Sequence, residues 1–217
     1  MGAPDSPSML RTFLFVLLCA TVGIARAAPT ILVFGDSISA GYGLPQGTGW
    51  VDLLRERLKA EHYDYKVANA SLSGETTVGG KNRLPATLAQ HKPQIVILEL
   101  GANDALRGAR AADISANLSA MISEARKYQS TVLLLGMRVP PNYGSEYEQK
   151  FRSVYQDIAK TKRVALAPFL FEGFAENRAL FQPDGIHPTV GAQRLMLETV
   201  WPHLQPLLAR PTVTTQQ

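Results

Sequence analysis

The chain has 217 residues, of which 46% are hydrophobic, and this is enough for one domain with a substantial core. Its 22 Lys and Arg residues outnumber the 18 Asp and Glu residues, but they form no basic run and are not interleaved with aromatic residues. The net charge of +4 therefore does not indicate a nucleic-acid partner. The single cysteine, Cys19, lies in an N-terminal apolar segment, so the rest of the chain has no disulfide and no cysteine metal site.

The first 27 residues have the pattern of a secretory signal peptide. Arg11 precedes an apolar segment at 13–24, and Ala25-Arg26-Ala27 follows it as a small-x-small cleavage sequence. The apolar segment is too short and too interrupted to span a bilayer. We therefore expect cleavage after Ala27 and a periplasmic or secreted mature protein with no stable membrane insertion. Met9 is an alternative start, because Met9-Leu10-Arg11 is a more usual opening for a signal peptide.

Short apolar runs alternate with longer amphipathic ones along the rest of the chain. In chain order, we expect a strand at 31–34, a helix at 51–60, a strand at 66–70, a helix at 81–91, a strand at 95–100, a helix at 113–127, a strand at 131–135, a helix at 146–160, a strand at 164–167 and a helix at 189–208. Pro85 is expected to shorten the second helix and Pro202 to bend the last one.

Five alternations of strand and helix predict an α/β fold, with parallel βαβ units and helices on both faces of one sheet. Right-handed crossovers bring the carboxyl ends of all the strands to one edge of the sheet, which is where binding sites form in such folds. We expect a single domain over 28–210, followed by a disordered tail at 211–217.

The first predicted strand ends in the sequence Gly35-Asp36-Ser37-Ile38-Ser39. A short apolar run that stops abruptly at glycine indicates a buried strand followed by a tight turn. A serine directly after this turn can present its hydroxyl at the sheet edge as a nucleophile. Asp and Ser are also common helix N-caps, so the same residues fit an ordinary strand-to-helix junction.

A base and oxyanion donors follow later strands. Asp184 precedes His187 by three residues, so its carboxylate can accept the Nδ1–H of the imidazole and leave Nε2 to take a proton from a serine. As isolated residues they also fit a turn former and a helix-entry residue, and no third ligand is spaced to join them at a metal. Gly74 and Asn103 each follow a strand, where a backbone N–H and a carboxamide can donate to a negative oxygen.

Four segments, in this order, resemble the signature blocks of the GDSL/SGNH hydrolase family. They are Gly35-Asp36-Ser37-Ile38-Ser39, Gly74, Gly101-Ala102-Asn103-Asp104 and Asp184-Gly185-Ile186-His187-Pro188. Local runs such as Ser39-Ala40-Gly41-Tyr42 and Pro141-Asn142-Tyr143-Gly144 are similar to the branch that contains bacterial periplasmic acyl-CoA thioesterases, lysophospholipases and arylesterases. The resemblance extends over nearly the whole mature chain.

The resemblance implies a flavodoxin-like three-layer α/β/α sandwich around a five-stranded parallel sheet. It implies that Ser37 is the nucleophile, His187 the general base and Asp184 the residue that orients the base. The oxyanion hole would consist of the N–H groups of Ser37 and Gly74 and the side chain of Asn103. Neither a metal nor a cofactor is required by this machinery.

The same resemblance places Pro141, Asn142 and Tyr143 along a groove for the acyl chain, although a plain connecting loop fits them as well. The expected protein is a monomeric serine esterase or thioesterase that acts on small-molecule acyl esters and thioesters, including arylesters, acyl-CoA and lysophospholipids. One alternative is a carbohydrate O-deacetylase, which would use the same triad with a smaller, polar pocket. The other is a secreted binding module that uses the sheet edge without chemistry.

Overall fold

A computed structural model describes residue 2 and residues 28–209. Its sheet consists of β1 (Thr30–Gly35), β2 (Lys66–Asn69), β3 (Ile95–Glu99), β4 (Thr131–Leu135) and β5 (Ala165–Ala167). The strands lie in the order β2-β1-β3-β4-β5 and every neighbouring pair is parallel, which confirms the predicted five-stranded parallel sheet. The predicted signal peptide at 1–27, apart from Gly2, and the predicted tail at 211–217 lie outside the described residues.

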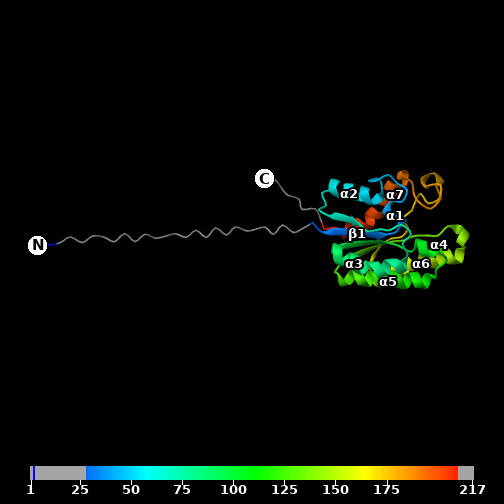
Figure 1. The fold of residues 1–217 in the computed structure, drawn as a ribbon, viewed down its shortest axis with the longest axis horizontal. Coiled ribbons are helices and arrows are strands. Elements are labelled where there is room, and N and C mark those ends of the chain that lie inside the picture. Colours follow the sequence, from blue (N-terminus) through cyan, green and yellow to red (C-terminus); the bar gives the residue numbers. More distant parts are fainter. Residues whose placement is uncertain (1, 3–27, 210–217) are drawn as a thin grey trace.

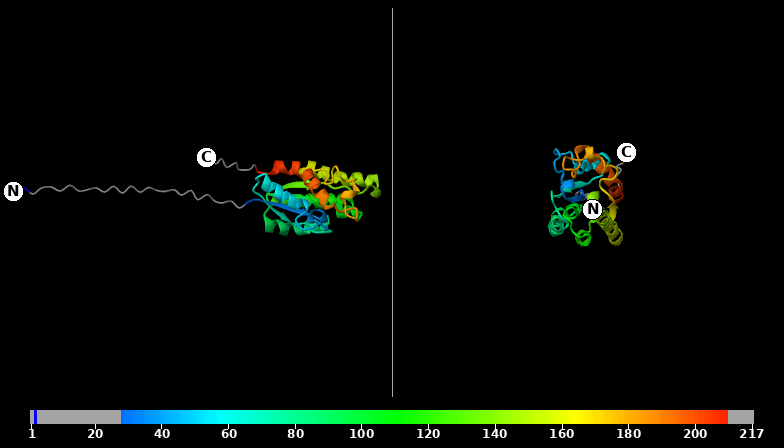
Figure 2. Two further views of the ribbon diagram at one scale, coloured as in Figure 1. Left: turned by 90° about the horizontal axis from the view of Figure 1, so that it is seen from above. Right: turned by 90° about the vertical axis from the view of Figure 1, so that its right-hand side faces the viewer.

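Helices cover both faces of the sheet. They are α1 (Ser37–Ala40), α2 (Trp50–Ala60), α3 (Thr77–His91), α4 (Ala102–Leu106), α5 (Ala111–Lys127), α6 (Ser145–Lys162) and α7 (Val190–Leu204), with 3₁₀ helices η1 (Pro141–Tyr143), η2 (Arg178–Leu180) and η3 (Gln205–Leu207). Figure 1 shows α2 and α7 on one side of the strands and α3, α5 and α6 on the other. In the right-hand view of Figure 2 these last three lie side by side along one face. The predicted three-layer sandwich is therefore confirmed.

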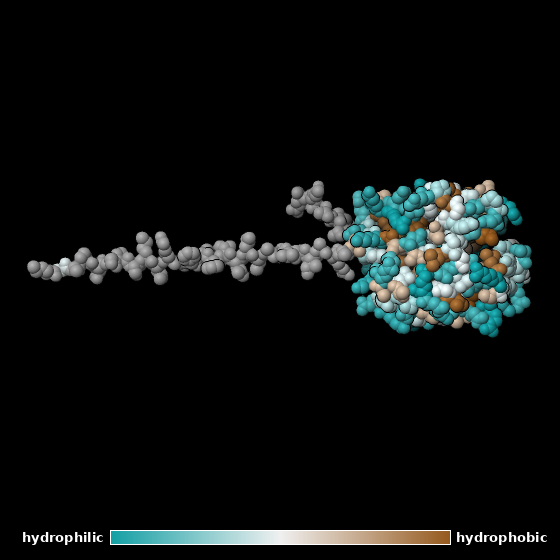
Figure 3. Space-filling view, viewed as in Figure 1, coloured by the Kyte–Doolittle hydropathy of each residue, from teal (hydrophilic) through white to brown (hydrophobic). Residues whose placement is uncertain are grey.

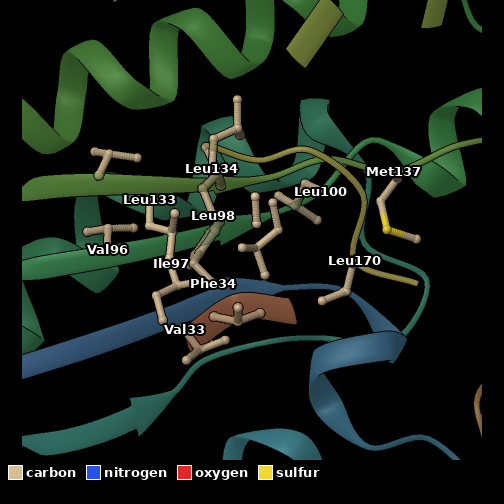
Figure 4. Packing of buried hydrophobic residues seen from close by; sticks show 14 of the residues in the cluster. Val33, Phe34, Val96, Ile97, Leu98, Leu100, Leu133, Leu134, Met137 and Leu170 are labelled. Carbon is tan, nitrogen blue, oxygen red and sulfur yellow. The ribbon is translucent and has the colours of Figure 1, made fainter. Parts of the chain in front are cut away.

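Within residues 28–209, no helix is both long and apolar enough to cross a membrane. The core instead lies between the sheet and its two helical layers. Figure 4 shows side chains of three adjacent strands packed together, with Val33 and Phe34 from β1, Ile97 and Leu98 from β3, and Leu133 and Leu134 from β4. These pairs are in register across the ladders, so the three central strands form one rigid base for the loops at their ends.

The second predicted helix, α3, begins at Thr77 rather than at residue 81 and continues through Pro85 to His91. Thr76 caps its first turn by accepting a hydrogen bond from the N–H of Gly79. Glycine disfavours a helix on intrinsic propensity, but a Cβ on Gly80 would lie only 2.5 Å from the Leu100 side chain. Close packing of α3 on the sheet thus overrides the local signal, and the expected shortening at Pro85 is wrong.

The last helix also differs from its prediction at both ends. It begins at Val190, and its α-helical part ends at Leu204 instead of continuing to residue 208. Pro202 lies inside the helix, and Pro206 lies in η3. Because Pro206 has no N–H to donate to the carbonyl of Pro202, the α-helical ladder stops and the 3₁₀ turn follows.

The order of the strands places the candidate site. The chain leaves β1 for β2 on one side and then returns to β3 on the other, so the connections diverge between β1 and β3. Ligand sites of open parallel sheets form at the carboxyl ends of the strands at such a point. Helix α1 directly follows β1, helix α4 directly follows β3, and both lie to the right of β1 in Figure 1. The topology therefore brings Ser37 and Asn103 to the same edge.

Candidate active site

Ser37 is the first residue of α1, a single turn of helix. Asp36 is the N-cap of this helix, and its Oδ1 accepts a hydrogen bond of 2.9 Å from the N–H of Ile38. Gly41, at φ 76°, ends the helix in the left-handed conformation that glycine adopts without strain. The interpretation of Asp36 as a helix cap is therefore confirmed, and this cap leaves the Ser37 hydroxyl free to meet groups from elsewhere in the chain.

The Ser37 hydroxyl lies against the loop that carries His187. The distance from Ser37 Oγ to His187 Nε2 is 2.8 Å, and the distance from His187 Nδ1 to Asp184 Oδ2 is 2.7 Å. A carboxylate on Nδ1 fixes the imidazole tautomer with its proton on that nitrogen, which leaves Nε2 as an acceptor towards the serine. The structure thus brings together three residues from opposite ends of the chain in the order that nucleophile activation needs.

Asp184 is held as an anion by the backbone of its own turn. Its Oδ1 accepts hydrogen bonds from the N–H groups of Ile186, at 2.9 Å, and His187, at 3.0 Å. Burial alone would raise the pKa of Asp184, but the hydrogen bonds from the His187 and Ile186 backbone and from the His187 ring lower it to about 2. The group that orients the imidazole is consequently charged throughout the neutral range.

The loop before α7, which carries His187, is held in shape by hydrogen bonds within the loop and to Tyr42. The Gln182 N–H donates to the His187 carbonyl at 2.7 Å, and the Gln182 side chain donates to the Tyr42 carbonyl at 2.8 Å. Phe181 and Pro188 form an antiparallel bridge at the base of the loop. The Tyr42 ring lies against the imidazole with 4.6 Å between the ring centroids. These contacts from α1's side of the site and from the loop itself restrict movement of the imidazole.

Two backbone N–H groups are available to a negative oxygen. Gly74 is exposed, has φ 79°, and lies in the turn after β2, which is tied to the end of β1 by a hydrogen bond from the Leu72 N–H to the Gly35 carbonyl at 3.0 Å. Over residues 28–209, the N–H groups of Ser37 and Gly74 donate to no other protein group. Free N–H groups beside a nucleophile are the donors that an oxyanion hole requires.

Asn103 lies in α4, and its carboxamide points towards the other two loops. Its Nδ2 donates to Asp36 Oδ2 at 3.0 Å and to the Glu75 carbonyl at 3.0 Å. Both partners are acceptors only, so the nitrogen and not the oxygen of the amide must face them. The carboxamide therefore stands between the turn after β1 and the turn after β2, on the side where Gly74 lies.

Two further carboxyl groups support these turns, and sequence reasoning gave neither of them a role. Glu99 is fully buried, and its Oε2 accepts hydrogen bonds from the Ser39 hydroxyl at 2.8 Å and the Asp36 N–H at 3.3 Å. Asp104 accepts hydrogen bonds from the N–H of Thr77, at 2.8 Å, and from its hydroxyl, at 2.6 Å, which joins α4 to α3. A single carboxylate at the end of an otherwise apolar strand is the signal that would have identified Glu99.

The segment of Pro141, Asn142 and Tyr143 forms η1, between β4 and α6. The Tyr143 hydroxyl donates to the Leu106 carbonyl at 3.0 Å, and the Tyr147 hydroxyl donates to the Ala109 carbonyl at 2.7 Å. The two rings also stack, with 6.4 Å between their centroids. The segment is therefore tied to the end of α4, the helix that carries Asn103.

Exposed apolar side chains lie next to the triad. Tyr42 is 53% exposed, Leu72 is 50% exposed and Ile186 is 42% exposed. The first contacts His187, the last precedes it in the chain, and Leu72 lies in the turn that carries Gly74. The face drawn in Figure 3 is mostly hydrophilic and carries only small, separate hydrophobic areas. The other exposed large apolar side chains within residues 28–209 are Val78, Tyr128, Val190 and Leu195. The surroundings of Ser37 therefore suit an apolar group.

Comparison with known proteins agrees with this geometry. The model of the GDSL-like lipase/acylhydrolase family matches residues 33–195. Esterase TesA of Pseudomonas aeruginosa is 52% identical over 182 residues, which are 84% of this chain and 90% of the relative. Thioesterase 1/protease 1/lysophospholipase L1 of Escherichia coli is 38% identical over 196 residues, which are 90% of this chain and 92% of the relative.

Solved structures show the same arrangement of strands and helices. A crystal structure of TesA has a TM-score of 0.81 at 51% sequence identity, and the alignment covers 82% of this chain and 99% of that chain. The family match, the identity of the relatives and the shared fold each extend over most of the described residues. The chain therefore belongs to the GDSL-like lipase/acylhydrolase family of ester hydrolases.

Proposed function

We propose that the protein hydrolyses acyl esters and thioesters through an acyl-enzyme on Ser37. The observation that carries this proposal is the continuous contact from Ser37 Oγ to His187 Nε2, at 2.8 Å, and from His187 Nδ1 to Asp184, at 2.7 Å. Asp184 and His187 alone also fit a loop that enters a helix. The serine hydroxyl at the second ring nitrogen is not needed for such a loop, and it is needed for nucleophilic catalysis.

In the first step, Ser37 Oγ bonds to the carbonyl carbon of the substrate while His187 Nε2 takes the hydroxyl proton. The carbonyl oxygen becomes an oxyanion held by the N–H groups of Ser37 and Gly74 and by the Asn103 carboxamide. Collapse of this intermediate breaks the bond to the leaving alcohol or thiol, which receives the proton from His187. The acyl group is then left on Ser37.

In the second step, water attacks the acyl-enzyme. His187 takes a proton from the water as the new bond forms, and it returns the proton to Ser37 Oγ when the acid departs. Asp184 stays ionised throughout and stabilises the imidazolium that forms in each step, which agrees with its lowered pKa of about 2. All proton transfers in this cycle are made by residues of the chain.

The substrate class that we propose is an apolar acyl group on an alcohol or thiol, as in arylesters, acyl-CoA and lysophospholipids. The exposed side chains of Tyr42, Leu72 and Ile186 support an apolar acyl group next to Ser37. We also propose that Pro141, Asn142 and Tyr143 line the path of the acyl chain, because η1 is tied to the helix of Asn103. The names of the esterase and thioesterase relatives support the same class.

Hydrolysis rates across acyl lengths test the substrate class. Nitrophenyl acetate, octanoate and palmitate are compared with an acetylated sugar, with Ser37→Ala as the background control. We expect higher kcat/KM for octanoate than for acetate and little activity on the sugar. A preference for the acetylated sugar would replace this proposal with a carbohydrate O-deacetylase. The absence of any Ser37-dependent hydrolysis would support the binding module instead.

We further propose that the protein acts as an exported monomer, in the periplasm or outside the cell. The pattern of residues 1–27, with cleavage after Ala27, supports the export. Mass spectrometry of the protein from the producing cell's periplasm and medium, with size-exclusion chromatography, tests both parts. A mature chain that starts elsewhere, or an oligomer, would contradict them.

A further inference from the structure

Asp36 has two carboxylate oxygens, and each has a different partner. Oδ1 accepts a hydrogen bond from the N–H of Ile38 at 2.9 Å, which is the helix-capping contact. Oδ2 accepts a hydrogen bond from the Asn103 carboxamide at 3.0 Å, across 67 positions of sequence. A serine would satisfy the cap with one oxygen. The second oxygen of Asp36 therefore has a task that the helix does not explain.

The Asn103 carboxamide has two N–H bonds, and both are in use in the free protein. One is directed to Asp36 and the other to the Glu75 carbonyl, at 3.0 Å each. An oxyanion needs one of them. A hydrogen bond to an ionised carboxylate is stronger than one to a neutral carbonyl, so the bond to Glu75 is the one that yields. Glu75 follows Gly74 directly, which puts this second N–H on the side of the other oxyanion donor.

We propose that Asp36 is a positioning residue for the oxyanion hole: its Oδ2 fixes one N–H of Asn103 so that the other N–H is directed at the oxyanion. In the free enzyme this second N–H of Asn103 donates to the Glu75 carbonyl, and the oxyanion replaces that carbonyl as the acceptor. This inference rests on the proposed function, because it gives Asn103 the task of stabilising the intermediate on Ser37.

The surroundings of Asp36 favour this task over a purely structural one. Asp36 is only 1% exposed, and burial raises the pKa of its carboxyl to about 6 against the opposing hydrogen bonds from Ile38 and Asn103. A buried carboxylate therefore costs stability at neutral pH, where it is ionised. The titratable groups that interact with it are Glu99, Asp104, Tyr155 and His187.

Asp36→Ser separates the two tasks, because serine keeps the helix cap and removes the contact with Asn103. We expect kcat to fall by about 10- to 100-fold on nitrophenyl octanoate. KM should change by less than about threefold, since the oxyanion exists only in the transition state and the intermediate. Asn177→Ala is the matched control: Asn177 is an exposed cap on η2 that accepts a hydrogen bond from Ala179, and its loss should leave kcat unchanged.

A double-mutant cycle with Asn103→Ala shows whether Asp36 acts through Asn103. Once Asn103 is alanine, adding Asp36→Ser should lower kcat by less than about twofold, because the group that it positions is absent. Asp36→Asn serves as a second variant if the serine variant folds poorly. Ile38 and Asn103 donate to different oxygens of Asp36, whereas asparagine has an oxygen at one of these two places and an NH2 group at the other. The variant therefore keeps only one of the two contacts, and we expect an intermediate loss of kcat.

The outcomes distinguish this inference from the proposed function. Wild-type protein that fails to hydrolyse nitrophenyl octanoate would overturn the proposed function and this inference with it. Active wild-type protein, together with full kcat in Asp36→Ser and Asp36→Asn, would overturn the inference alone. Losses in the two single variants that multiply in the double variant would also overturn it, because Asp36 would then act without Asn103.

Discussion

Gly35 allows the first and third strands to carry the turns of Ser37 and Asn103 side by side. It pairs with Glu99 across the parallel ladder, and the Glu99 side chain folds over it. A Cβ on Gly35 would lie 2.5 Å from Glu99 Oε2 and 2.9 Å from the Glu99 carbonyl oxygen. The second atom is backbone and cannot move away without disturbing the ladder. The glycine is therefore required by this close approach, since its backbone φ is not positive.

Replacing Gly35 by alanine should destabilise the protein and reduce its activity. Overpacking at a site that cannot relax lowers the free energy of unfolding by about 1–3 kcal/mol. Displacement of Glu99 would also disturb the hydrogen bond that it accepts from the Asp36 N–H. Urea unfolding measures the first effect and ester hydrolysis the second.

Gly191→Ala is a matched control for Gly35→Ala, because a Cβ there meets Leu180 at an ordinary 3.6 Å inside α7. This variant should be as stable as the wild type or slightly more stable, since alanine favours a helix. Equal unfolding midpoints for Gly35→Ala and the wild type would show that the two strands can move apart without loss of stability, which would contradict the requirement for glycine beside Glu99.

At the residue scale, sequence reasoning selected Ser37, Gly74, Asn103, Asp184 and His187, and the structure brings all five to one sheet edge. Each is a polar or turn residue that comes three or four residues after a predicted strand or shortly before the last helix, so a local pattern identifies it. The contacts of Asp36 with Asn103 and with Glu99 could not be predicted in this way. They join residues 67 and 63 positions apart, and no local pattern encodes such a pairing.

At the element scale, the five strands and the long helices could be predicted because their apolar residues repeat with a clear period. The short helices α1 and α4 could not. They have four and five residues, too few to display a period, although both carry candidate catalytic side chains. Their existence depends on the turns around them instead.

The turn before α4 shows how such a helix is set by tertiary contacts. Gly101 has φ 117°, and a Cβ there would lie 2.6 Å from the Tyr155 hydroxyl. That hydroxyl, from α6, donates to the Leu100 carbonyl at 3.1 Å. Tyr155 is fully buried, so α6 holds the end of β3 in place and thereby sets where α4, the helix that contains Asn103, begins. No feature of the sequence near Gly101 reveals this partner.

At the scale of the whole molecule, the site carries an electrostatic cost that should appear in the pH dependence of stability. Burial, together with the charge of Asp36, raises the pKa of Glu99 well above its ordinary value, and burial raises that of Asp36 to about 6. At a pH between the ordinary pKa and the raised pKa of these two carboxyl groups, the folded chain binds more protons than the unfolded chain. The free energy of unfolding should therefore decrease as the pH rises through this range.

Glu99→Gln should flatten this dependence. The glutamine keeps the shape and an acceptor oxygen for Ser39 and Asp36 but does not titrate. The variant therefore loses less stability than the wild type as the pH rises above 4.5, the ordinary pKa of glutamate. Urea unfolding across that range measures the difference. The pKa of Asp184 is lowered from 3.8 to about 2, so this group stabilises the fold fully at pH values above 3.8. Its contribution is lost only as the pH falls towards 2, which is below the pH range of this measurement. Parallel curves for Glu99→Gln and the wild type would mean that Glu99 does not change its protonation on folding.

The central claim is that Ser37, activated by His187, is the nucleophile. The most direct measurement is the site of labelling by a fluorophosphonate, read by mass spectrometry of the intact protein and of its peptides. We expect one adduct per chain, on the peptide that contains Ser37, with no adduct in Ser37→Ala and slow labelling in His187→Ala. A label on a different serine, or an unlabelled wild type that still hydrolyses esters, would contradict the assignment of Ser37.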